Sequence, residues 1–84
     1  MPENTPAGRT AAFIRGQMAA NRRTGRELAE VLEIGATAAS RRLHGETPFS
    51  IDELGTVADW LGLDAAEVSA AVYGHKMPRV PALH

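Results

Sequence analysis

The chain has 84 residues, a formal net charge of −1 and no cysteine. This length supports one small domain, whose core is only marginally stable unless it is helical, well capped or dimeric. The lack of cysteine excludes disulfides and thiolate metal sites, and the sequence has no signal-peptide pattern and no apolar run of 18 residues. We therefore expect a cytoplasmic protein without membrane contact.

The charges are divided unevenly along the chain. Residues 9–45 carry seven arginines against three glutamates, whereas residues 46–75 carry six carboxylates and no cation. The first part should attract phosphate and the second should repel it. On a nucleic-acid duplex, this division would orient the protein and limit its non-specific affinity for the phosphate backbone. The alternative, in which both sets of charges merely solvate helix faces, remains open at this point.

The N-terminal segment, residues 1–9, combines two prolines, a glycine and small polar residues, and this composition predicts a disordered leader. Thr10 can cap a first helix that runs to about Asn21. The buried stripe of this helix is predicted to contain Phe13, Ile14 and Met18. These features make the first helix a scaffold element.

A second helix is predicted to begin at Thr24. Thr24 and Glu27 have the spacing of a capping box, in which each side chain binds the backbone N–H of the other residue. An apolar stripe follows and ends before Gly35, where a corner is expected. Helical pattern resumes at Ala36 and ends at Gly45, so residues 24–45 read as two short helices joined by a tight turn.

The second helix of this pair has one apolar face and one polar face. At 100° per residue, Ala39 and Leu43 fall on one side, with Thr37, Arg41 and His44 opposite. The polar face has mostly short side chains and carries one cation, Arg41, between them. A helix with such a face fits the major groove of DNA.

A fourth helix should begin after Ser50. Phe49, Ser50, Glu53 and Leu54 combine a capping box with a hydrophobic staple. The predicted core stripe of this helix is Ile51, Leu54, Val57, Ala58 and Leu61. Trp60 projects away from that stripe, and it is expected either under the C-terminal segment or in a subunit interface.

A fifth helix is predicted from about residue 65 to Tyr73, because residues 63–68 repeat the staple and capping box and Gly74 follows. Residues 76–84 contain two prolines and several apolar side chains, so we expect an irregular tail that can cover a groove or a partner. Five helices with short turns and no strand pattern predict an all-α fold.

The residues of the paired helices resemble the lambda-repressor-like, Cro/CI-type helix-turn-helix proteins, whose sequences typically run LAxxLG(I/V)SxxTxSRxLxG. The matching positions are Leu28, Ala29, Leu32, Ile34, Ser40, Arg41, Leu43, His44 and Gly45. Together with the later EL..VA..LGL pattern, the resemblance spans residues 10–75. It implies a five-helix DNA-binding domain of the kind found in phage or prokaryotic regulators.

Two positions depart from the family pattern. Glu33 replaces the usual glycine of the turn, and Gly35 replaces the small polar residue that usually caps the recognition helix. A left-handed conformation is common at the position of Glu33 and costs a non-glycine residue about 1 kcal/mol. We expect the turn to survive with a shift toward Gly35.

The predicted site is a DNA surface. Arg41 is expected to be the principal base reader, because a guanidinium can bond O6 and N7 of one guanine. A phosphate contact is the alternative for Arg41, as a C-terminal helix position is for His44. The expected base-contacting residues are Ala36, Thr37, Ala38, Ser40, Arg41 and His44, and the expected phosphate-contacting residues are Arg22, Arg23, Thr24, Gly25, Arg26, Arg42 and Thr47.

The resulting hypothesis is a sequence-specific, nucleoid-associated transcriptional regulator, most simply a repressor that binds a pseudo-palindromic operator as a homodimer. The expected dimer or partner surface contains Trp60, Val68, Val72 and Tyr73. One alternative is an antitoxin or accessory regulator that also binds a protein through its tail, and another is a helical interaction module without DNA binding. No catalytic or metal-binding motif occurs, so we expect neither an enzyme nor a cofactor.

Overall fold

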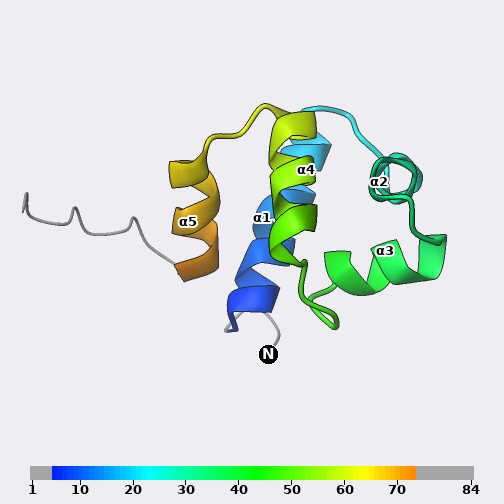
Figure 1. Ribbon diagram of the computed structural model, residues 1–84, viewed down its shortest axis with the longest axis horizontal. Helices are drawn as coiled ribbons and strands as arrows, with labels where there is room; N and C mark the ends of the chain where they lie inside the picture. Colours follow the sequence, from blue (N-terminus) through cyan, green and yellow to red (C-terminus); the bar gives the residue numbers. More distant parts are fainter. Residues whose placement is uncertain (1–4, 74–84) are drawn as a thin grey trace, which may run out of the picture.

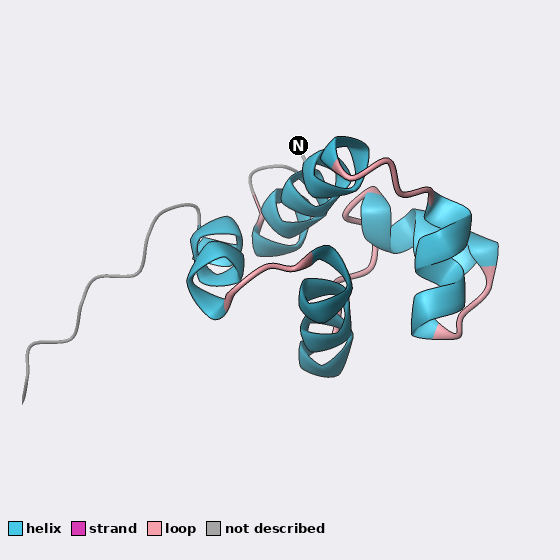
Figure 2. Cartoon of the chain, turned by 90° about the horizontal axis from the view of Figure 1, so that it is seen from above, coloured by secondary structure: helices cyan, strands magenta, loops and turns pink. Residues whose placement is uncertain are grey.

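The computed structural model describes residues 5–73, and all regular secondary structure in this range is helical. The helices are α1 (Pro6–Ala20), α2 (Gly25–Leu32), α3 (Ala36–Leu43), α4 (Ile51–Leu61) and α5 (Ala65–Tyr73). Seen from above (Figure 2), α1 and α4 face each other, while α2 and α3 lie at one side and α5 at the other. In the described range no helix is both long enough and apolar enough to cross a bilayer.

The core lies where α1, α2 and α4 converge. Leu28 and Val57 are its largest fully buried side chains. Burial of such a side chain stabilises a fold by about 1.5–3 kcal/mol, so these two positions anchor α2 and α4. The buried cluster consists of Ile14, Met18, Leu28, Ala29, Ala39, Phe49, Val57 and Leu61.

The three capping boxes predicted from the sequence are present. Thr24 Oγ1 accepts the Glu27 N–H at 3.1 Å, and Glu27 Oε1 accepts the Thr24 N–H at 2.8 Å. Ser50 and Glu53 form the same reciprocal pair at the start of α4. Asp64 and Glu67 do so at the start of α5. Each box satisfies amides that have no acceptor within their own helix.

The start of α1 differs from the prediction. The helix begins at Pro6 with Thr5 as its N-cap, and Thr5 Oγ1 accepts the Gly8 N–H at 2.9 Å. Residues 6–9 therefore belong to α1 and not to a leader, and Thr10 is a buried residue of the helix. Pro6 is compatible with this start, because the N–H that proline lacks has no acceptor in the first turn of a helix.

The first four helices end in the same way, with the last residues closed by a Schellman-type pair of hydrogen bonds. After α2, for example, the Ile34 N–H donates to Ala29 O at 3.0 Å and the Glu33 N–H donates to Glu30 O at 3.2 Å. This closure places one residue in the left-handed region. The residues with positive φ are Arg22, Glu33, Gly45 and Gly62.

The turn between α2 and α3 keeps its left-handed residue at Glu33. Glu33 has φ 57° and ψ 44°, whereas Gly35 is extended with φ −74° and ψ 163°. The expected shift toward Gly35 was therefore wrong. The hydrogen bonds at the end of α2 fix the left-handed position by count from the helix, whatever side chain stands there.

Ile51 was predicted to belong to the core stripe of α4, and this prediction was wrong. Its side chain is 87% exposed, whereas Val57 and Leu61 of the same helix are buried. Ile51 is the first residue of α4, and its exposure shows that no described helix covers it. The helical period placed Ile51 on the apolar face of α4. It did not reveal that the neighbouring helices do not extend far enough to cover this residue.

The left-handed conformation of Glu33 gives a stability prediction. Glu33→Gly should increase the free energy of unfolding by about 0.5–1 kcal/mol, because glycine adopts this conformation without the Cβ penalty but gains entropy in the unfolded chain. Glu33→Ala is the matched control, since it removes the same charge and keeps the Cβ. Chemical denaturation of both variants measures the difference, and equal stabilities would show that Glu33 is unstrained.

Candidate nucleic-acid interface

Helix α3 turns one face toward the core and the opposite face toward solvent. Ala39 is 1% exposed and Leu43 packs against the buried cluster. This orientation is the one that the helical projection predicted. The exposed residues of this segment are Ala36, Thr37, Ser40, Arg41 and His44, whereas Ala38 and Arg42 are half-buried.

Two arginines, one on α3 and one on α1, fix the position of α3. Arg42 Nε donates to Glu53 Oε1 of α4 at 3.0 Å, and its Nη1 donates to Ala38 O at 3.1 Å. Arg15 of α1 donates from Nη1 to the carbonyl oxygen of Leu43 at the end of α3. Helix α3 is thus held by bonds that lie outside its exposed face. Sequence reasoning missed both roles, since neither pair has a spacing that a single helix could reveal.

The Arg42–Glu53 pair is partly buried, with 19% of each side chain exposed. The hydrogen bond from Arg42 lowers the pKa of the Glu53 carboxyl, and the Ser50 N–H, which donates to the same oxygen at 2.9 Å, acts in the same direction against the cost of burial. One carboxylate oxygen therefore caps α4 and holds α3. The expected phosphate contact by Arg42 competes with this structural use of its guanidinium.

The N-terminus of α2 and the exposed face of α3 form one continuous surface. A shallow hollow between them is lined by Gly25, Arg26, Ala36, Ser40, Leu43 and His44. The first amides of a helix have no acceptor within the helix, and the helix dipole favours an anion at this end. Thr24 caps α2 from the same place, so its hydroxyl and its N–H are already occupied.

The three arginines around this helix start differ in their freedom to bind an anion. The Arg23 guanidinium lies 5.5 Å from the centre of the Trp60 ring and Arg23 Nη1 is 3.8 Å from Glu27 Oε2. Arg26 has a side chain that is 91% exposed, and its contact with Glu30 is long, at 4.0 Å. Arg22 is exposed at the left-handed corner after α1. Arg22 and Arg26 are therefore better placed for a phosphate than Arg23.

His44 is joined to the residue one turn earlier. Its Nδ1 lies 2.7 Å from Ser40 O and 3.3 Å from Ser40 Oγ. A carbonyl oxygen can only accept, so Nδ1 carries the proton in the first contact. The ring atom left for a ligand is Nε2. His44 is the C-cap of α3, which agrees with the helix-terminal interpretation, and its contact with DNA stays a prediction.

The residues expected in a dimer surface mostly pack within the chain. Trp60 is half-buried against the core cluster and beneath Arg23. Val68 and Val72 are half-buried, and Arg9 Nη2 donates to Val72 O at 2.9 Å, which ties the end of α5 to α1. Tyr73 is 55% exposed. The expected irregular tail, residues 76–84, lies outside the described residues.

Comparison with known proteins gives one family. A family profile described as the BetR domain matches residues 6–75, a range that includes all five described helices. No curated protein and no solved structure matches the chain. Among the described residues, no group of three side chains that could hold a metal ion occurs.

The Arg42–Glu53 pair predicts a loss of stability in acid. Because the fold lowers the pKa of Glu53 below its ordinary value of 4.5, the stabilisation is present above that value and is lost as pH falls through the folded-state pKa. Arg42→Met should lower the free energy of unfolding by about 1–2 kcal/mol at neutral pH and weaken its pH dependence below pH 5. Arg26→Met, which removes an exposed ion pair, is the control and should change little.

Proposed function

Because the chain belongs to the BetR domain family, a family of helical domains within the helix-turn-helix regulators, we propose that it binds double-stranded DNA as a transcriptional regulator. The observation that carries this proposal is the exposed face of α3. Its side chains are mostly small or polar, and its surface continues into the start of α2. α2 and α3 also form one end of the molecule, so a duplex can approach them without meeting α5 (Figure 1).

We place α3 in the major groove. Arg41 is the principal base reader in this arrangement, since its exposed guanidinium can donate two hydrogen bonds to one guanine. Thr37 lies one turn earlier on the same face and offers a hydroxyl and a methyl group. Ala36 and Ser40 allow close approach, and His44 adds Nε2 at the end of the helix. The half-buried Ala38 stands at the margin of this face.

Phosphate contacts would come from the surface around the start of α2. The amides of Gly25 and Arg26 and the side chain of Arg26 lie beside the hollow that borders α3. Anion binding at a helix start is a general property of free amides and the helix dipole. Arg22 and Thr47 lie at neighbouring corners, while Arg23 and Arg42 already have partners within the chain.

More specifically, we propose that the protein is a lambda-repressor-like, Cro/CI-type repressor that binds a pseudo-palindromic operator as a homodimer. The arrangement of α2 and α3, with a left-handed residue at the end of α2, is compatible with that class. Two copies would then read half-sites about 34 Å apart, which is one turn of DNA. Occlusion of a promoter would follow from such binding.

Selection of bound sites from random double-stranded DNA tests the proposal. The expected result is enrichment of a sequence with two inverted half-sites about 10 base pairs apart. Enrichment of a single half-site would keep DNA recognition and overturn the dimer. Failure to enrich any sequence would overturn DNA recognition and favour a helical module that binds protein.

The role of Arg41 gives a prediction about specificity. Arg41→Ala should weaken binding to the selected site by about 1–3 kcal/mol and relax the preference at one base pair, with little change on random DNA. Thr37→Ala is a matched control on the same face that should cost less. Binding titrations on selected and random duplexes make the measurement, and equal losses on both would make Arg41 a backbone contact.

The role of Arg26 gives a prediction about salt dependence. Arg26→Ala should reduce the slope of log K against log salt by about 1 and weaken all sequences alike, because one phosphate contact is lost. Glu30→Ala is the control, since it removes the neighbouring charge without removing a cation. An unchanged slope for Arg26→Ala would place the phosphate elsewhere.

A further inference from the structure

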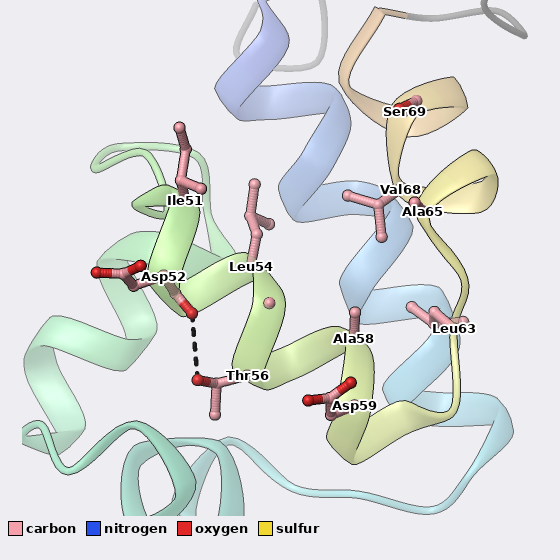
Figure 3. A pocket seen from close by; sticks show the side chains of 11 residues that line it. Ile51, Asp52, Leu54, Thr56, Ala58, Asp59, Leu63, Ala65, Val68 and Ser69 are labelled. Atoms are coloured by element: carbon pink, nitrogen blue, oxygen red, sulfur yellow. Dashed lines mark hydrogen bonds between the residues drawn. The ribbon is translucent and has the colours of Figure 1, made fainter.

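An apolar groove runs between α4 and α5, on the part of the molecule away from α3. Figure 3 shows Val68 of α5 pointing across the groove toward α4, where Leu54 lines the opposite side. Ala58 and Leu63 continue the apolar lining, and Ile51 stands 87% exposed at one end. An exposed isoleucine beside further apolar surface is costly in water, so this groove fits an apolar occupant.

The charge along the groove restricts that occupant. Asp52 and Asp59 line the outer edge of the groove on α4, with the Asp52 side chain on the side away from α5 (Figure 3), and neither forms an ion pair with any described residue. The capping box places Asp64 and Glu67 at the start of α5, on the same part of the surface. A second copy would bring the same carboxylates against these, which disfavours pairing through this face. The fitting occupant is apolar and basic.

The last residues of the chain have this chemistry. Lys76-Met77-Pro78 is followed by Arg79-Val80-Pro81 and then by Ala82-Leu83, so cation, apolar residue and proline recur every three residues. A period of three matches the polyproline II helix, in which Met77, Val80 and Leu83 would share one face. Proline at every third position also lowers the entropy lost when such a segment is ordered.

The geometry of the groove matches this repeat. α4 and α5 run in opposite directions (Figure 1), so the end of α5 at Tyr73 lies at the same end of the pair as Ile51. Asp52 and Asp59 are separated by about 10.5 Å along the helix axis. Lys76 and Arg79 would be about 9 Å apart in a polyproline II conformation. A chain that turns back at Gly74 therefore meets the two carboxylates in the order of its two cations.

We propose that residues 75–84 fold back into the α4–α5 groove of their own chain, with Lys76 beside Asp52 and Arg79 beside Asp59. Met77 and Val80 then cover Ile51 and Leu54, and Leu83 reaches the Leu63 end. This docking is independent of DNA binding, because the groove and the α3 face belong to different parts of the molecule.

Paramagnetic broadening in the full chain tests the proposal. The sequence has no cysteine, so Ala82→Cys gives a single site for a nitroxide label. The expected result is selective loss of amide signal in the groove, stronger near Leu63 than near Ile51, with no loss in α3. A tail that moves freely from Tyr73 would broaden the Ile51 end more, and that result would overturn the proposal.

A mixture of labelled unenriched chain and unlabelled ¹⁵N-enriched chain identifies the source of the broadening. Within-chain docking predicts no broadening in this mixture, whereas broadening at the groove would show that a second copy supplies the tail and would overturn the proposal.

A charge swap tests the assigned pairs. Asp52→Lys combined with Asp59→Lys should abolish the selective broadening, and adding Lys76→Glu with Arg79→Glu should restore it. Glu30→Lys on α2, a residue with an exposed side chain outside the groove, is the matched control and should leave the broadening intact. If the four-site variant is folded, as judged from its helical signals, but does not regain the selective broadening, these pairs are refuted.

Discussion

A single carboxylate oxygen connects α3 to the start of α4. Glu53 Oε1 accepts the Ser50 N–H, which starts α4, and the Arg42 Nε, which fixes α3. Because the start of α4 and Arg42 of α3 share this acceptor, the orientation of α3 follows from the position of α4 in the core. Arg15 adds a second attachment at the neighbouring residue of α3, where it donates to the Leu43 carbonyl. The proposed reading face therefore depends on contacts that lie behind it.

The sequence predicted the local features of this fold well, because capping boxes and helical periods involve residues within a few positions of each other. The boxes at Thr24 and Ser50 belong to this class. The turn after α2 was expected to shift toward Gly35, but its left-handed residue is Glu33. Features that depend on tertiary neighbours were harder to foresee. Ile51 fits the helical period yet lies beyond the reach of any covering helix in the described chain.

The same distinction applies to the candidate site. The orientation of Arg41 and Thr37 follows from the helical period and was predicted. Trp60 and Glu53, which contact Arg23 and Arg42, lie on another helix, α4, so the charges of the two arginines alone suggested phosphate contacts. A cation count identifies a basic region but does not distinguish an arginine that packs on a tryptophan from one that reaches solvent.

The side chains of Thr37 and Arg41 form no hydrogen bond or ion pair within residues 5–73, and both are exposed. Substitutions at these two positions should therefore have small effects on folding, since surface changes away from special contacts usually fall within about 0.5 kcal/mol. If α3 reads DNA as proposed, binding preference and fold stability are encoded in separate residues of one short helix. On that proposal, related chains would diverge in the DNA they recognise without compensating mutations in the core, and an engineer can randomise the same positions on an intact scaffold.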